Sequence, residues 1–154
     1  MLSETGKQKA GKKVTLICSR NTVDGAFPPL ILALQAARKG ADTNVFFTFM
    51  GIEVIRRGGA EKVKFFPPGV MGVVPGMPAL ATKMMLNMAE KRAQVPSPAE
   101  LLEMCRYEGV KLWACLMTMQ MMNLTEEDLV EGTKVTDAGG YMDMALESDL
   151  NLFI

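Results

Sequence analysis

The residues of this chain best suited to covalent chemistry are its three cysteines, at positions 18, 105 and 115. The chain has no histidine, which excludes Cys-His and Ser-His nucleophile pairs, histidine-ligated metals and histidine acid-base catalysis. Chemistry must therefore use cysteine, carboxylates, amines or backbone dipoles. An odd number of cysteines without a C-x-x-C pair indicates neither a disulfide framework nor a zinc site, and it fits a reducing cytoplasm.

Cys115 lies where a strand is expected to change into a helix. Residues 110–124 read VKLWACLMTMQMMNL, an apolar run with β-branched and aromatic members followed by good helix formers. In an open α/β sheet, ligands usually bind at the carboxyl ends of the strands, and the start of a helix favours a thiolate. Cys115 is therefore the candidate nucleophile. Free cysteines are most often small buried hydrophobes, however, and spacing alone favours that packed role.

The other two cysteines favour structural roles. Cys105 follows Leu101 by four residues on the apolar face of an expected helix, which predicts a place in the core. Cys18 ends the first expected strand and should reach the same sheet edge as Cys115. Cys18 is a candidate second thiol at that edge, although a packed cysteine is favoured.

Further residues are candidates for lining the site. Arg20 and Lys83 are cations near the expected rim that could stabilise a sulfur anion, although such side chains are usually only solvated. Asp24 lies in a T-V-D-G segment, where it could form a backbone nest or cap the following helix. A structural role in the turn is the simpler interpretation of Asp24. No phosphate-binding glycine motif accompanies it.

Met117 begins a row of methionines after Cys115 that continues at positions 119, 121 and 122. Thioether clusters can bind Cu(I), but methionine also fills irregular gaps in cores and interfaces. We interpret the row as packing behind the thiol and predict no metal site and no cofactor.

The expected elements alternate between strands and helices along the chain. Apolar runs predict five strands, at residues 14–19, 44–49, 110–114, 133–136 and 150–154. Periodicity and capping residues predict helices between them, at residues 27–39, 50–57, 78–91, 97–108, 116–122, 125–131 and 140–148. This alternation predicts an α/β fold with a parallel, doubly wound sheet.

Residues 65–82 contain no charged side chain but four prolines and three glycines. These breakers argue against a membrane-spanning helix. Residues 67–77, ending at Met77, are expected to form an apolar loop covered by the active-site cleft, a neighbouring subunit or a membrane surface. Membrane contact is thus open but not favoured.

Length and charge limit the class of protein. At 154 residues, one domain is expected over residues 13–154, after a flexible, lysine-rich tail at residues 1–12 that lacks the apolar core of a signal peptide. The 17 basic and 17 acidic residues balance, which argues against a nucleic-acid partner.

Several motifs together resemble the DsrE/DsrF/TusD-like sulfur-relay family, and most closely its DsrE-like branch, sometimes labelled peroxiredoxin-like. They are T-x-D-G-A-F-P-P-L-I-L-A from residue 22, F-F-T-F-M-G, P-G-M-P-A-L-A-T-K-M-M, V-K-L-W-A-C-L-M-T-M-Q-M-M and a terminal L-F-I. The A-C-x-M-x-M segment around Cys115 is the most specific of them.

The resemblance implies a flavodoxin-like three-layer α/β sandwich with a mostly parallel sheet of about five strands, assembled into trimers or hexamers. It implies that Cys115 accepts and passes on sulfane sulfur as a persulfide, without a metal or organic cofactor. It also implies sulfur exchange with TusA-like or rhodanese-like proteins. It assigns no role to Cys18.

Two alternatives stay open from the sequence. A noncatalytic oligomeric binding or scaffold module would bury Cys115, because some branches of the wider superfamily lack the cysteine. Thiol-disulfide or peroxide chemistry would use Cys18 together with Cys115, and it would require their α-carbons to lie within about 7 Å.

Overall fold

A five-stranded, all-parallel sheet forms the centre of the molecule, in a computed structural model that describes residues 11–154. The first ten residues of the predicted tail lie outside the described range. The sheet order is β4-β3-β2-β1-β5, which confirms the predicted number of strands and their parallel pairing. The strands are β1 Lys13–Cys18, β2 Asp42–Phe47, β3 Lys111–Cys115, β4 Lys134–Thr136 and β5 Leu150–Phe153.

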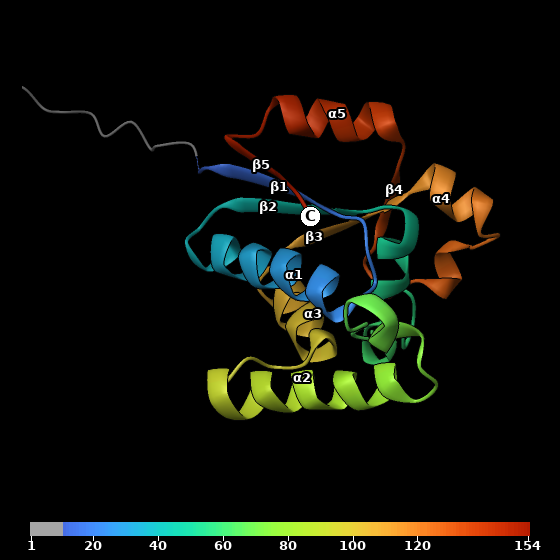
Figure 1. Cartoon of the computed structure of the whole chain (residues 1–154). Coiled ribbons are helices and arrows are strands. Elements are labelled where there is room, and N and C mark those ends of the chain that lie inside the picture. Colours follow the sequence, from blue (N-terminus) through green and yellow to red (C-terminus); the bar gives the residue numbers. More distant parts are fainter. Residues whose placement is uncertain (1–10) are drawn as a thin grey trace, which may run out of the picture.

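Helices cover both faces of the sheet, which confirms the three-layer α/β sandwich (Figure 1). On one face lie α1 and α3, whereas α5 covers the other, and α4 follows directly on β3. Short 3-10 turns η1 to η4 complete the connections. The helices and 3-10 turns are α1 Val23–Arg38, α2 Met77–Ala93, α3 Pro98–Tyr107, α4 Leu116–Met121, α5 Ala138–Leu146, η1 Phe49–Val54, η2 Ala60–Lys62, η3 Gly69–Val73 and η4 Glu126–Asp128.

The main core lies between the sheet and the layer of α1 and α3. Parallel register places Leu16, Val45 and Leu112 in one row across β1, β2 and β3, and each is almost completely buried. Leu30 of α1 and Leu101 of α3 belong to the same apolar cluster. This core fixes the strands so that β1, β2 and β3 end at a common edge.

Helix α1 begins at Val23, four residues before the predicted start near Phe27. The prediction relied on proline as a first-turn residue, but the first turn forms earlier, because the amides of Gly25 and Ala26 donate to the Thr22 carbonyl at 3.0 and 2.8 Å. Two prolines therefore lie inside the helix.

A core thiol partly compensates for the second of these prolines. Pro29 has no N–H to donate to the carbonyl of Gly25, four residues earlier. The Sγ–H of Cys18 donates to that carbonyl instead, at 3.8 Å. Cys18 therefore joins the end of β1 to the interior of α1.

Capping determines several other helix starts. Ser97 and Glu100 form the predicted capping box of α3, and Thr125 and Asp128 form one at η4. Helix α5 begins two residues earlier than the predicted Gly140, because the Asp137 carboxylate accepts the N–H of Gly140 at 2.8 Å and caps the turn before it.

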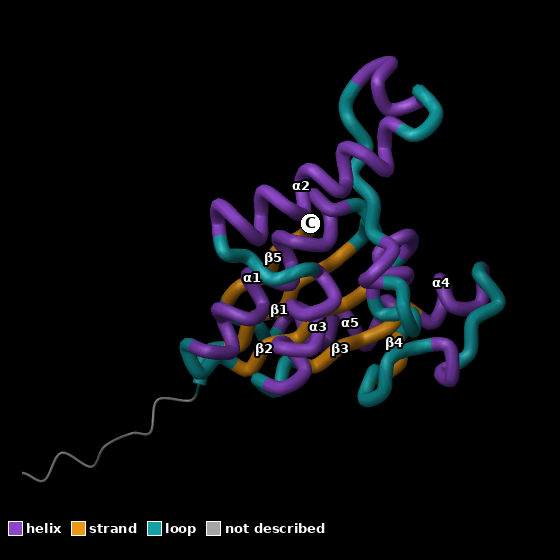
Figure 2. Tube along the Cα trace, turned by 90° about the horizontal axis from the view of Figure 1, so that it is seen from below, coloured by secondary structure: helices purple, strands orange, loops and turns teal. Residues whose placement is uncertain are grey.

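Residues 66–93 form an apolar arm, comprising η3 and α2, on the outside of the molecule (Figure 2). The predicted loop at residues 67–77 contains the 3-10 turn η3, and no residue of η3 or α2 is buried. Val70 is 79% exposed and Val73 is 81% exposed. Among the helices within residues 11–154, none is long and apolar enough to span a bilayer.

Candidate functional site

Cys115 is the last residue of β3 and the N-cap of α4, so the predicted strand-to-helix switch lies where the sequence indicated. Its backbone is extended, with φ −72° and ψ 115°, and Leu116 begins the helix directly after it. The residue is 5% exposed. Cys115 therefore lies at the carboxyl edge of the sheet and is largely buried.

The pKa of the Cys115 thiol lies below that of an ordinary cysteine. Burial raises the pKa of this thiol, but hydrogen bonds from the Thr118 hydroxyl and amide, the Thr48 hydroxyl and the Met117 amide oppose burial and lower the pKa overall. All of these donors favour the anion. Because the thiolate is the reacting form of cysteine, the surroundings of Cys115 are suited to nucleophilic chemistry.

The two threonines come from segments far apart in the sequence. Thr118 is 1% exposed, and its Oγ1 lies 3.4 Å from the Oγ1 of Thr48. The backbone N–H of Phe49 donates to the Thr118 Oγ1 at 3.0 Å. Phe49 has φ +47°, a left-handed conformation that is strained for an aromatic residue. The loop after β2 is thus bent against the first turn of α4.

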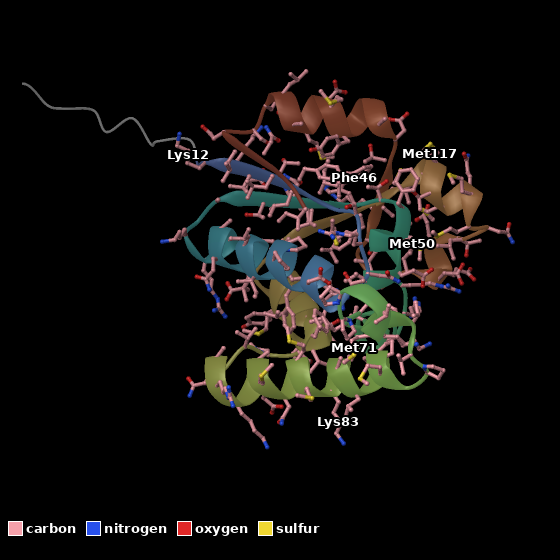
Figure 3. The ribbon with its side chains drawn as sticks, in the orientation of Figure 1. Lys12, Phe46, Met50, Met71, Lys83 and Met117 are labelled. Atoms are coloured by element: carbon pink, nitrogen blue, oxygen red, sulfur yellow. The ribbon has the colours of Figure 1, made fainter. Side chains whose placement is uncertain are left out.

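Exposed apolar side chains lie around this edge, and we call Phe49, Met50, Leu116 and Met117 the apolar collar. Their exposed fractions are 52%, 48%, 40% and 50% respectively. Met50 and Met117 belong to the two segments that meet at Thr118, at the end of the molecule occupied by η1 and α4 (Figure 3). Such a surface suits contact with another protein better than the capture of a small ion.

Cys18 ends at the same edge of the sheet as Cys115 but on the opposite face. Register aligns Cys18 with Phe47, and Phe47 with Ala114, so the next residue, Cys115, points the other way. Strand β2 lies between the two cysteines, which separates their α-carbons by about 9–10 Å. A direct disulfide requires less than about 7 Å, so it cannot form without backbone movement.

The surroundings of Cys18 and Cys105 favour neutral thiols. Cys18 is completely buried, and its Sγ–H donates to the carbonyls of Arg20 and Gly25. Cys105 is also completely buried and donates to the Leu30 carbonyl at 3.3 Å. Burial raises the pKa of each thiol to about 12.

Of the other predicted site residues, Met117 lies beside Cys115. Arg20 contributes its backbone carbonyl to the Cys18 thiol, and Asp24 is exposed in the first turn of α1. Met77 and Lys83 belong to α2, and Figure 3 shows Lys83 at the far side of the molecule from Met117. No cation is among the groups that lower the pKa of the Cys115 thiol within residues 11–154.

The methionine row divides between the core and the surface. Met119 is buried and Met122 packs partly against the core, as expected for packing behind the thiol, whereas Met117 and Met121 are 50% and 66% exposed. Within residues 11–154, no group of three or more cysteine, aspartate or glutamate side chains is arranged to hold a metal ion.

Sequence reasoning did not find Thr48 and Thr118. They are 70 residues apart in sequence, and threonine in an apolar segment carries no distinctive signal.

A family model described as the DsrE/DsrF/DrsH-like family matches residues 10–153. This chain belongs to that family. The finding confirms the resemblance seen in the sequence motifs.

Two relatives of this DsrE-like chain match it over nearly their full lengths. The sulfur carrier protein DsrE2 of Allochromatium vinosum is 32% identical over 159 residues, covering 93% of this chain and 98% of DsrE2. The Bacillus subtilis protein YrkE is 31% identical over 156 residues, covering 93% of this chain and 97% of YrkE.

Solved structures share the fold of this DsrE-like chain. The ychN protein from E. coli superposes with a TM-score of 0.63 at 14% identity, covering 93% of this chain and 99% of that protein. MTH1491 from Methanobacterium thermoautotrophicum gives a TM-score of 0.53 at 13% identity, with coverages of 92% and 98%. At these identities the likeness concerns the fold alone.

Proposed function

We propose that this protein is a sulfur carrier or sulfurtransferase in which Cys115 accepts and passes on sulfane sulfur as a persulfide. The Cys115 thiolate attacks the outer sulfur of a donor persulfide, R–S–SH. A new S–S bond forms on Cys115 while the donor S–S bond breaks, and the bonding electron pair leaves with the donor as R–S⁻. The proton stays on the transferred sulfur, so the exchange needs no external oxidant or reductant.

The single observation that carries the proposal is the contrast among the three thiols. Hydrogen bonds lower the pKa of Cys115 at the sheet edge, whereas burial raises the pKa values of Cys18 and Cys105 to about 12. Only a thiol that is partly ionised near neutral pH reacts readily with sulfane sulfur. The name of the A. vinosum relative, a sulfur carrier, agrees with this chemistry.

The test is mass spectrometry of the intact protein after incubation with a persulfide donor. The wild-type protein should gain the mass of one sulfur atom, and peptide mapping should place it on Cys115. The matched variants Cys18→Ala and Cys105→Ala should load normally, whereas Cys115→Ser should not. An unchanged wild-type mass, under conditions in which a competent control carrier is loaded, would overturn the proposal.

A noncatalytic scaffold is the second candidate, because Cys115 is only 5% exposed. In a scaffold, the thiol of the native protein would react slowly with an alkylating reagent and would recover its reactivity only on denaturation. In a carrier, native Cys115 should react faster than a simple thiol at neutral pH, because more of it is ionised.

We further propose that the protein works in a reducing cytoplasm as a homo-oligomer, a trimer or hexamer, and exchanges sulfur with TusA-like or rhodanese-like proteins. The apolar arm supports an oligomer, because Val70 and Val73 leave a large apolar surface exposed. Sedimentation should show a smaller species for Val73→Glu. Tyr107→Glu is the control, because Tyr107 is 92% exposed but belongs to α3, outside residues 66–93.

A further inference from the structure

A small polar cavity lies at the amino ends of the strands, on the face of the sheet that α5 covers. It has a volume of about 240 Å³, and the first residues of β1, β2, β3 and β4 all line it, together with residues at the end of α5. Figure 3 shows Lys12, the neighbour of Lys13, at the opposite end of the sheet from Met117. Strand β3 runs for about 13 Å from Lys111 to Cys115, so the cavity is separate from the thiol site.

Three ammonium groups and two carboxylates line this cavity. Lys13 pairs with Glu147 at 2.8 Å, and Lys111 pairs with Asp42 at 2.7 Å, so these four charges cancel. The third ammonium, that of Lys134, forms no ion pair with any carboxylate of residues 11–154. One positive charge is therefore left over at the cavity.

Asn44 supplies a hydrogen-bond donor to the same cavity. The residue is only 7% exposed, and its Oδ1 accepts the Nε1–H of Trp113 at 3.0 Å, which leaves the amide nitrogen on the other side. That nitrogen has no hydrogen-bond acceptor within residues 11–154, yet no fully enclosed polar side-chain atom in this range lacks a partner. The Asn44 nitrogen therefore reaches the open space of the cavity. The Lys134 ammonium lies 5.3 Å from the centre of the Trp113 ring, so one side chain positions both donors.

We propose that this cavity binds a small tetrahedral oxyanion, of the phosphate or sulfate type, through the Lys134 ammonium and the Asn44 amide nitrogen. Both groups donate hydrogen bonds and accept none, which suits an anion. The cavity is smaller than the pockets of about 300–1,000 Å³ that hold drug-sized molecules, so its ligand has few heavy atoms.

The shape of the ligand follows from where the donors start. Lys134 belongs to β4 and Asn44 to β2, while the remaining N–H groups of Lys13 and Lys111 approach from β1 and β3. Donors that come from four strands match an anion with oxygens in several directions better than a planar carboxylate. The proposal is independent of persulfide chemistry at Cys115.

The test is a titration with sodium phosphate, followed by the fluorescence of Trp113, the one tryptophan of the chain. Sodium chloride keeps the ionic strength constant, so that general screening does not change. The emission should change and then saturate, because an anion on the Lys134 ammonium alters the charge beside the ring. Two charge-assisted hydrogen bonds correspond to a dissociation constant of about 1 mM. A wild-type protein that shows no saturable change in fluorescence or in heat of binding would overturn the proposal.

Lys134→Met keeps an apolar side chain at the Trp113 ring but removes the charge, and it should weaken phosphate binding by about tenfold or more. Lys39→Met is the matched control, because it removes the same charge from an exposed residue outside the cavity. Lys39→Met should bind phosphate as the wild type does. Equal weakening in the two variants would overturn the site.

Asn44→Asp keeps an oxygen that accepts the Trp113 N–H but replaces the amide nitrogen by an anionic oxygen, and it should abolish saturation. Lys134 is exposed, so Lys134→Met decides the matter if Asn44→Asp does not fold. Acetate should bind about tenfold more weakly than phosphate, because it has fewer oxygens for the same donors. Equal affinity for acetate would contradict a tetrahedral ligand.

Discussion

Gly51→Ala should damage both the fold and the thiol site. Gly51 lies in η1 against the end of β1, and a methyl group there would lie 2.6 Å from the Cys18 carbonyl carbon and 3.0 Å from the Ser19 nitrogen. The Cys18 carbonyl oxygen would lie closer still, and ordinary contact begins near 3.4 Å, so the loop would have to move by more than 0.8 Å. That shift would also disturb the nearby bond between the Phe49 N–H and Thr118.

The expected loss of stability combines two effects. Overpacking against backbone costs about 1–3 kcal/mol, and the lost hydrogen bond costs about 0.5–1.5 kcal/mol, which together give roughly 1.5–4.5 kcal/mol. Urea unfolding measures this loss, and alkylation should show a higher midpoint for Cys115. Gly139→Ala is the control, because its methyl would lie in ordinary contact within α5 and should add up to about 1 kcal/mol. A Gly51→Ala protein with wild-type stability and alkylation would refute the reasoning.

Three further predictions follow from contacts described above. Pro29→Ala restores a helix N–H, so Cys18→Ala should lower the free energy of unfolding by less in that background. A double-mutant cycle from urea unfolding should give a coupling energy of about 0.5 kcal/mol or more, and strictly additive effects of the two substitutions would contradict the prediction. Ser97→Ala should cost about 1 kcal/mol in urea unfolding. Backbone and side-chain hydrogen bonds from Ser97 lower the pKa of Glu100. The stabilisation from the Glu100 carboxylate should therefore be present above the ordinary pKa of glutamate and be lost as the pH falls through the lowered pKa of the folded state. Glu100→Gln should abolish this pH dependence, and a stability difference between wild type and Glu100→Gln that does not change with pH would contradict the prediction. Diamide should form no disulfide between Cys18 and Cys115 within one chain, and a bridged peptide in a non-reducing map would disprove their placement.

The sequence predicted those features that depend on local pattern. The change from β-branched and aromatic residues to methionine and leucine predicted the strand-to-helix switch at Cys115. The capping pair of Ser97 and Glu100 predicted the start of α3. Both signals act over a few residues, so the rest of the fold does not override them.

Features that depend on distant contacts could not be predicted in the same way. The start of α1 was misplaced because the helix contains two interior prolines, and one contact that compensates for Pro29, from the Cys18 thiol, comes from β1. The contacts of Thr118 also come from a distant segment, because the loop after β2 supplies the Phe49 N–H that donates to its hydroxyl oxygen. Neither contact leaves a periodic trace in the sequence.

The opposite facing of Cys18 and Cys115 limits how a sulfur atom can leave this protein. Cys105, the third cysteine of the chain, lies with Cys18 on the side of the sheet covered by α1 and α3. Neither Cys18 nor Cys105 can reach Cys115 without backbone movement. In the proposed carrier, a persulfide on Cys115 would therefore have no resolving thiol in its own chain. Its release would require a collision with another molecule, and its lifetime between collisions would depend on the partner's concentration.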